Sequence, residues 1–451
     1  MNEAYRLTCY TDKEALKKCD GKMVKQDDGS YILTIDSDNF EYISPLYNTK
    51  VINGEIENKK FFTNEFYLLE YGPENESGKK FWRCKYKVYR YYIGCNYFEE
   101  NDILVNKLVC HFNNLDAWMH GFGLFCISDT EHLESLIKNG VGKIQVDSYK
   151  INDELTIEVQ TRGTGLYNFH EQNSIIIKKN NATVFELLDI ANKLAKLLSL
   201  FCFTEIETQE TMHFMGDSYK NIFLEGKQWV FNKSLYPSNI IDYQQIKPYF
   251  KSIFTNYIKA SKKVKSAIDM ICSSFYYSIS PGASINEFLS VAKAIESYYD
   301  SEIINFEEQE KKKKEEITAL IKSEQVSSKT KKLLKDALRG EFKVPFQERL
   351  KQFFKDNIDN LSQSTIRSID NLSMLIADTR NYYTHLDKKE GKRTIDELDL
   401  HIITLSLRIF CINIILKHLS NGYDSWKQSI VLMARNTLEN YCCRNKLEDI
   451  Q

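Results

Sequence analysis

Arg380-Asn381-Tyr382-Tyr383-Thr384-His385 is the most informative stretch of this chain, because it brings an arginine, an amide and a histidine within six residues. Histidine titrates near neutral pH and can move a proton. Arginine offers a fixed fork of donors to phosphate oxygens, and the amide can orient either partner or the phosphate. These groups can carry out phosphodiester chemistry without a metal, so Arg380, Asn381 and His385 are the candidate catalytic residues.

The motif lies at the end of a predicted helix that begins near Ser364 or Thr365. Arg380 lies at the margin of its apolar stripe. Asn381 and His385 are four residues apart and share a face, whereas Arg380 and His385 diverge by about 140° on an ideal helix. One helix alone therefore does not bring the arginine and the histidine together. The predicted buried stripe consists of Ile369, Leu372, Ile376, Thr379 and Tyr383.

A second amphipathic helix is predicted over residues 285–299. Glu296 lies eleven residues after Ile285, about 20° away around the helix, and therefore on or beside the apolar face. A carboxylate on that face needs a partner, unless it reaches solvent at the edge of the stripe. The apolar side chains at three- and four-residue spacing are Ile285, Phe288, Leu289, Ala292, Ile295 and Tyr299.

Between these two helices, residues 305–340 form a charged insertion, rich in lysine around 311–314 and 329–335. An exposed helical hairpin with a solvated face explains this composition, and a basic patch that holds RNA phosphates is the alternative. A further helix is predicted after Pro345, in which Arg349, Lys351 and Lys355 continue the same bias.

The segment from Asp396 to Leu419 is apolar on nearly all sides, which suits the centre of a helical bundle or a dimer seam. Its apolar run over residues 402–416 is interrupted by polar side chains and is shorter than a membrane span. A buried core helix, and no membrane association, is therefore expected. The interrupting residues are Thr404, Ser406, Arg408 and Asn413.

Strand signals dominate the N-terminal half. We predict a β-rich domain over residues 1–238, with two sub-lobes divided near residue 145, and an all-α bundle over residues 239–451; the fold class is α+β. The glycine pairs and the separated histidines of the N-terminal domain form no recognisable catalytic constellation. The expected strands are 31–35, 66–71, 81–92, 155–159, 174–177, 203–215 and 228–235, and the expected helix is 185–201.

Composition narrows the function classes. A chain of 451 residues is expected to form two or three domains. Its net charge of −2 argues against a protein that coats nucleic acid nonspecifically, because such proteins are usually basic. The 11 cysteines are scattered without a C-x-x-C pair, which predicts reduced thiols in a cytoplasmic protein. The N-terminus shows no apolar signal segment.

The R-N-x-x-x-H pattern of residues 380–385 resembles the signature of HEPN ribonucleases (higher eukaryote and prokaryote nucleotide-binding domains). The ending Thr384-His385-Leu386-Asp387 is similar to that of the HEPN domain in the ApeA anti-phage family. The order of helix, charged insertion, motif helix and long core helix supports this resemblance, strongly over residues 280–420 and diffusely elsewhere. Leu386 stands where the family often has an aromatic residue.

The resemblance implies a metal-independent endoribonuclease without a cofactor. It implies that His385 moves the proton, that Arg380 stabilises the phosphorane and that Asn381 holds the phosphate or His385. It also makes Arg380 the candidate partner of Glu296, because HEPN domains pack their first helix against the motif helix. Glu296, Tyr383, Thr384 and Asp387 are the supporting candidates.

The implied partners are RNA, plausibly tRNA, a second copy of the chain in a homodimer or higher homo-oligomer, and a phage-encoded trigger. The large N-terminal domain would then act as sensor or autoinhibitor in abortive infection. The competing interpretation is a non-catalytic HEPN module for dimerisation or nucleotide binding, joined to a β-rich recognition domain.

Overall fold

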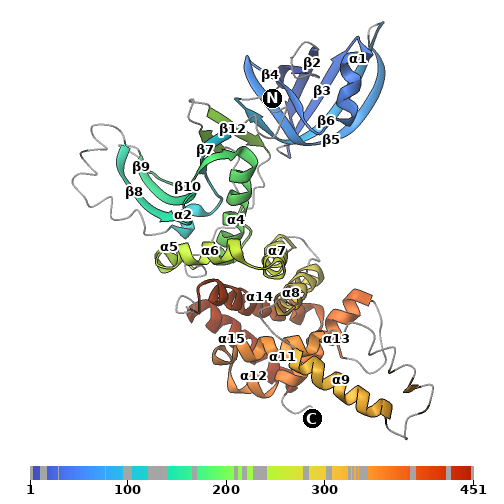
Figure 1. Ribbon diagram of the computed structural model, residues 1–451, viewed down its shortest axis with the longest axis vertical. Coiled ribbons are helices and arrows are strands. Elements are labelled where there is room, and N and C mark those ends of the chain that lie inside the picture. Colours follow the sequence, from blue (N-terminus) through green and yellow to red (C-terminus); the bar gives the residue numbers. More distant parts are fainter. Residues whose placement is uncertain are drawn as a thin grey trace. The chain divides into compact units, whose positions relative to one another are not determined.

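The computed structural model divides the chain into two compact units (Figure 1). Unit 1 comprises Met1–Leu198, Ile206–Pro237 and Asp242–Lys251, and unit 2 comprises Ser199–Glu205, Ser238–Ile241 and Ser252–Gln451. The structure describes residues 4–10, 18–28, 30–76, 78–94, 104–119, 134, 141–164, 170–207, 212–215, 221–226, 241–277, 284–300, 307–322, 327, 330–331, 334, 344–385, 393–422 and 428–447.

Unit 1 begins with an antiparallel barrel. Its strands follow the order β3-β2-β1-β4-β5-β6, and a further pairing of β3 with β6 closes the ring. Alternate residues of β3, such as Leu33 and Ile35, are fully buried in the barrel core, as expected for strands with one face inward. The strands are β1 (Ala4–Tyr10), β2 (Lys18–Lys25), β3 (Tyr31–Ser37), β4 (Ile52–Ile56), β5 (Lys59–Glu76) and β6 (Lys79–Ile93).

The sheet of unit 1 continues from β6 into an open part with the order β12-β11-β7-β10-β9-β8. Because β7 pairs with β10 and β11, this part contains residues on both sides of residue 145, where a division was expected. The described residues 203–207 lie outside any strand, and residues 228–235 lie outside the described part of the chain. The strands are β7 (Leu104–Cys110), β8 (Val141–Lys150), β9 (Leu155–Thr164), β10 (His170–Thr183), β11 (Met212–Met215) and β12 (Asn221–Gly226).

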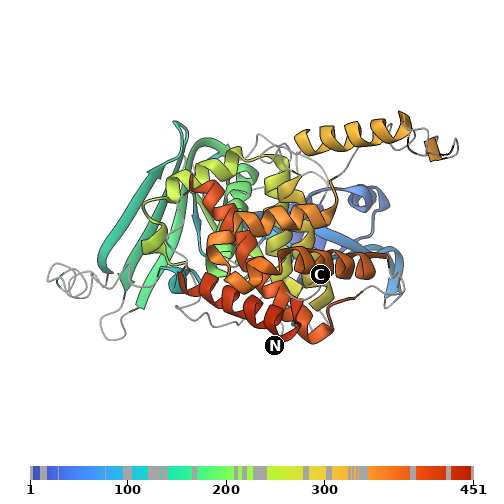
Figure 2. The same cartoon turned by 90° about the horizontal axis from the view of Figure 1, so that it is seen from below.

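Unit 2 is helical, and Figure 2 shows its helices, coloured yellow to red, gathered into a bundle. The predicted α+β class, with a β-rich N-terminal part and a helical C-terminal part, is therefore confirmed. Two helices, α4 (Val184–Cys202) and α6 (Phe250–Lys259), have residues in both units. The helices that build the bundle are α7 (Lys262–Tyr277), α8 (Ser284–Tyr299), α11 (Phe346–Asp356), α12 (Gln363–Arg367), α13 (Ile369–His385), α14 (Glu397–Leu419) and α15 (Gln428–Arg444).

Helix α14 is the core helix that its sequence predicts. The Asp396 side chain caps it by accepting a hydrogen bond from the Asp399 amide at 2.8 Å. The segment Asp399–Leu419 is long and apolar enough to cross a membrane, but most of it is buried. Helix α14 contacts α7, α8 and α15, as expected for the central helix of a bundle.

Helices α8 and α13 bury most of the residues predicted to be inward. On α8, Phe288, Ala292, Ile295 and Tyr299 are buried, while Ile285 and Leu289 are half-buried; on α13, Leu372, Ile376 and Thr379 are buried, while Ile369 and Tyr383 are half-buried. Part of the charged insertion forms α9 (Glu307–Lys322), whose described lysines are exposed.

The core of unit 2 also holds an ion pair. Glu287 of α8 and Arg408 of α14 are 2.8 Å apart, with 1% and 7% of their side chains exposed. The Arg408 guanidinium lies over the Phe275 ring, 4.9 Å from its centroid. Burial lowers the pKa of Arg408, and the charge of Glu287 opposes this shift. A charge at such depth is stable only while its partner is present.

We expect Arg408→Met to lower the free energy of unfolding by about 3–5 kcal/mol, because it leaves the Glu287 carboxylate buried without a countercharge. Urea unfolding followed by far-UV circular dichroism measures the loss. The double variant Glu287→Leu/Arg408→Met removes both charges and should recover most of it. An unfolding midpoint of Arg408→Met equal to that of the wild type would contradict the buried pair.

Candidate active site at the end of helix α13

The motif occupies the last turn and a half of α13, where the helix leaves the bundle core. Thr379, just before it, is fully buried. Its hydroxyl donates to the Leu375 carbonyl at 2.7 Å and accepts from the Ile395 amide at 3.0 Å. The second hydrogen bond holds the residue that precedes the N-cap of α14 against the motif helix. The Thr384 hydroxyl donates to the Arg380 carbonyl at 2.8 Å. The backbone that carries the motif is thus held from both ends.

Arg380 lies at the margin of the buried stripe, as its helical spacing predicts, and its side chain contacts α8. Its Nη2 donates to Glu296 Oε2 at 2.8 Å, which confirms the expected contact between these two residues; 21% and 34% of their side chains are exposed. Nη1 donates to Asn381 Oδ1 at 3.2 Å, and the guanidinium lies over the Phe346 ring of α11, 5.6 Å from the centroid. Three neighbours therefore fix the orientation of this cation.

His385 and Asn381 are exposed at the helix end. Among the described residues, His385 has no hydrogen-bond or ion-pair partner, and none joins it to Arg380 or Asn381. The structure thus brings Arg380 together with Glu296 and Asn381, but it does not bring His385 to the arginine within one chain. An imidazole in this position is accessible to a bound substrate or to a second protein surface.

The remaining candidates have different surroundings. Tyr383 is half-buried and meets the Tyr382 ring edge to face, with centroids 5.1 Å apart. Burial raises the pKa of Tyr383, and the nearby charge of Glu397 adds to the shift, so its hydroxyl stays protonated at neutral pH. Thr384 is exposed, and Asp387 lies outside the described residues.

Sequence reasoning placed Arg349 with the charged surface run, but the structure buries its side chain to 6% exposure. Nη1 donates to the Glu296 carbonyl at 3.0 Å and lies 4.0 Å from Glu296 Oε1, while Nη2 donates to Asp300 Oδ1 at 3.1 Å. The signal was available, because Arg349 lies three residues after Phe346 and one before Leu350, within the apolar stripe of α11.

Asp300, just beyond α8, extends these contacts to a third helix. Its second carboxylate oxygen pairs with Lys263 of α7 at 2.5 Å. Hydrogen bonds and charge from Lys263 and Arg349 lower the pKa of Asp300 against the opposing effect of burial. Within the described part of the chain, no group of three or more histidine, cysteine, aspartate or glutamate side chains is placed to hold a metal ion.

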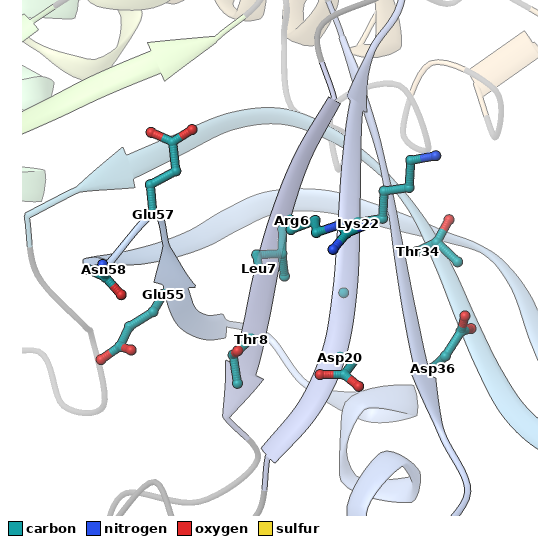
Figure 3. A pocket seen from close by; sticks show the side chains of 11 residues that line it. Arg6, Leu7, Thr8, Asp20, Lys22, Thr34, Asp36, Glu55, Glu57 and Asn58 are labelled. Carbon is teal, nitrogen blue, oxygen red and sulfur yellow. The ribbon is translucent and has the colours of Figure 1, made fainter.

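A separate hollow lies in unit 1, with a volume of about 590 Å³ (Figure 3). Its polar lining residues alternate along the strands with buried ones such as Leu33 and Ile35, so it lies on the outer face of the barrel. Asp36 in its lining is bound in a bidentate manner by Arg83 at 2.8 and 2.9 Å. The charged side chains around it are of both signs: Arg6, Lys22, Asp20, Asp36, Glu55 and Glu57.

A family model matches the part of the chain that contains this site. Residues 289–424 match the family model described as Apea-like HEPN. No curated protein and no solved structure gave a significant match. The matched segment runs from α8 to just past α14, and it contains both Glu296 and the complete motif 380–385. It points to a defence-related HEPN module. Residues 289–424, in the helical C-terminal unit, therefore form an Apea-like HEPN domain.

Proposed function

We propose that the HEPN domain is a metal-independent endoribonuclease. The observation that carries the proposal concerns the motif inside the matched segment 289–424: its arginine is held by neighbouring side chains, and its histidine is exposed. Arg380 is a cation oriented by Glu296, Asn381 and Phe346, and His385 is an exposed imidazole at the helix end. An oriented cation and an accessible proton carrier are the two groups that phosphodiester transesterification needs.

In the proposed mechanism the RNA 2′-hydroxyl attacks the adjacent phosphorus while His385 takes up its proton or protonates the departing 5′-oxygen. Arg380 stabilises the charge that develops on the phosphorane oxygens, which is where preorganised electrostatics contribute most. Asn381 holds the phosphate or His385. The products are a 2′,3′-cyclic phosphate and a 5′-hydroxyl. DNA is not cleaved, because it lacks the 2′-hydroxyl.

The divergence of Arg380 and His385 around α13 favours an active site shared between two copies of the chain. An exposed His385 from one copy would complete the site built around Arg380 of the other. A two-fold symmetric dimer would form two such sites, because each copy presents the same surface to its partner.

The biological role we propose is anti-phage defence by abortive infection. RNA with an exposed loop, tRNA in particular, suits an enzyme that needs a flexible backbone around the scissile phosphate. The β-rich unit 1 would sense a phage component and hold the nuclease inactive until then, in the cytoplasm of the cell. The second candidate is a non-catalytic HEPN module, which is favoured by the use of Arg380 in contacts within the chain.

We expect purified protein to cut total bacterial RNA into discrete fragments in the presence of EDTA, and His385→Ala to slow this cleavage by about 10²–10⁴-fold, because the proton carrier is lost. Gel analysis with end-group mapping measures both. His418→Ala, which changes another histidine in the last turn of a helix, is the matched control and should cleave like the wild type. Full cleavage by His385→Ala would disprove its role.

If the purified wild type is inactive, extract from infected cells supplies the trigger, and continued inactivity there supports the non-catalytic alternative.

A mixing experiment tests the shared site. Arg380→Met and His385→Ala proteins should each be inactive, and a refolded equimolar mixture should regain up to about a quarter of the wild-type rate, because half of the dimers then contain one intact composite site. A mixture of Arg380→Met with Asn381→Ala is the comparison, since these two residues are in contact and belong to one half-site. No recovery in the first mixture, with mixed dimers verified by differential tags, would place the whole site in one chain.

A further inference from the structure

Glu296 serves two arginines at once. Its Oε2 accepts from Arg380 at 2.8 Å, and its Oε1 lies 4.0 Å from Nη1 of Arg349. The same Nη1 donates to the Glu296 carbonyl at 3.0 Å. One carboxylate thus bridges the buried guanidinium of α11 and the half-buried guanidinium of the motif.

These contacts belong to a longer chain of alternating charges that runs from α7 to α13. Lys263 pairs with Asp300, Asp300 with Arg349, Arg349 with Glu296, and Glu296 with Arg380. Lys263, Arg349 and Arg380 are cations, and only Asp300 and Glu296 are anions. Along this series of ion pairs the positive charges exceed the negative ones by one, and the residue at the motif end, Arg380, is a cation.

We propose that Arg349 is a positioning residue that keeps Arg380 available for an RNA phosphate by sharing the charge of Glu296. Without Arg349, Glu296 would act on Arg380 alone and largely neutralise it, so a phosphate would meet an ion pair without net positive charge. With Arg349 in place, Glu296 orients Arg380, and the group of two arginines and one carboxylate keeps a net positive charge. The inference rests on the proposed function only in naming RNA phosphate as the ligand.

The burial of Arg349 explains why this effect should be large for a residue that does not touch the substrate. Its side chain is 6% exposed, so water screens its interaction with Glu296 much less than it screens surface pairs. Both anions it contacts lie at the C-terminal end of α8 or just beyond it, which fixes the guanidinium beside Glu296 independently of RNA.

The proposal is tested by measuring how tightly the full-length protein binds bulk bacterial tRNA. Every variant also carries His385→Ala, which prevents cleavage. Arg349→Met should bind about tenfold more weakly and should lower the slope of log affinity against log salt by about one, because Arg380 no longer neutralises a phosphate. Adding Glu296→Gln to Arg349→Met should restore both values, since the carboxylate that neutralises Arg380 is removed. A double variant that binds as weakly as Arg349→Met would overturn the proposal and leave Arg349 a purely structural role.

The control is Arg444→Met, which also removes an arginine paired with an aspartate of unit 2, Asp399, and should leave the salt slope unchanged. Arg349→Lys keeps the charge and should behave like the wild type, which separates loss of charge from loss of packing if the Met variant is unstable. A changed slope for Arg444→Met, or a slope for Arg349→Lys as low as that of Arg349→Met, would count against the proposal.

A second measurement needs no RNA. The coupling between Glu296→Gln and Arg380→Met in urea unfolding should be larger when Arg349 is Met than when it is Arg, because the carboxylate is no longer shared. An unchanged or smaller coupling overturns the proposal. If no variant binds tRNA, the ribonuclease proposal loses its support, while the unfolding cycle still decides whether Arg349 shares Glu296.

Discussion

Helix α8 carries carboxylates on two opposite faces, and the packing of unit 2 depends on how their charges are matched. Glu287 and Glu296 are nine residues apart, which places them about 180° from each other around the helix. Glu287 pairs with Arg408 of α14, and Glu296 pairs with Arg380 of α13. Since an unmatched buried charge is costly, α8 can rotate or slide only at the expense of both pairs. The register of α8 against α14 and the orientation of Arg380 in the motif are therefore set together.

The two pairs contribute differently. The Glu287–Arg408 pair is almost completely buried, so its main effect is that either charge alone is strongly destabilising. The Glu296–Arg380 pair is partly exposed and adds little to the free energy of folding. Its effect is geometric, because it directs a cation that would otherwise sample several rotamers. The pair remote from the motif holds α8 against α14, and the pair at the motif orients Arg380.

Much of unit 2 was predictable because its apolar spacing is regular. The predicted helix over 285–299 corresponds to α8 and the predicted core helix to α14. The segment predicted as one helix from Ser364 or Thr365 instead forms α12 and α13, divided at Ser368. In unit 1 the local signals predicted the strands that form β3 and β6, but not the pairing of β3 with β6 that closes the barrel. Register between strands distant in sequence depends on contacts that no local pattern contains.

The sequence by itself determined the composition of the motif, the helix that carries it and the divergence of Arg380 from His385, since all three follow from residue identity and helical periodicity. Only the tertiary structure decided whether Glu296 reached solvent or Arg380, and that Arg349 lies buried between Glu296 and Asp300 rather than on the surface. The reason is physical. A charged side chain on the edge of an apolar stripe can face water or a partner with similar local cost, and the choice depends on which countercharge another helix brings within reach.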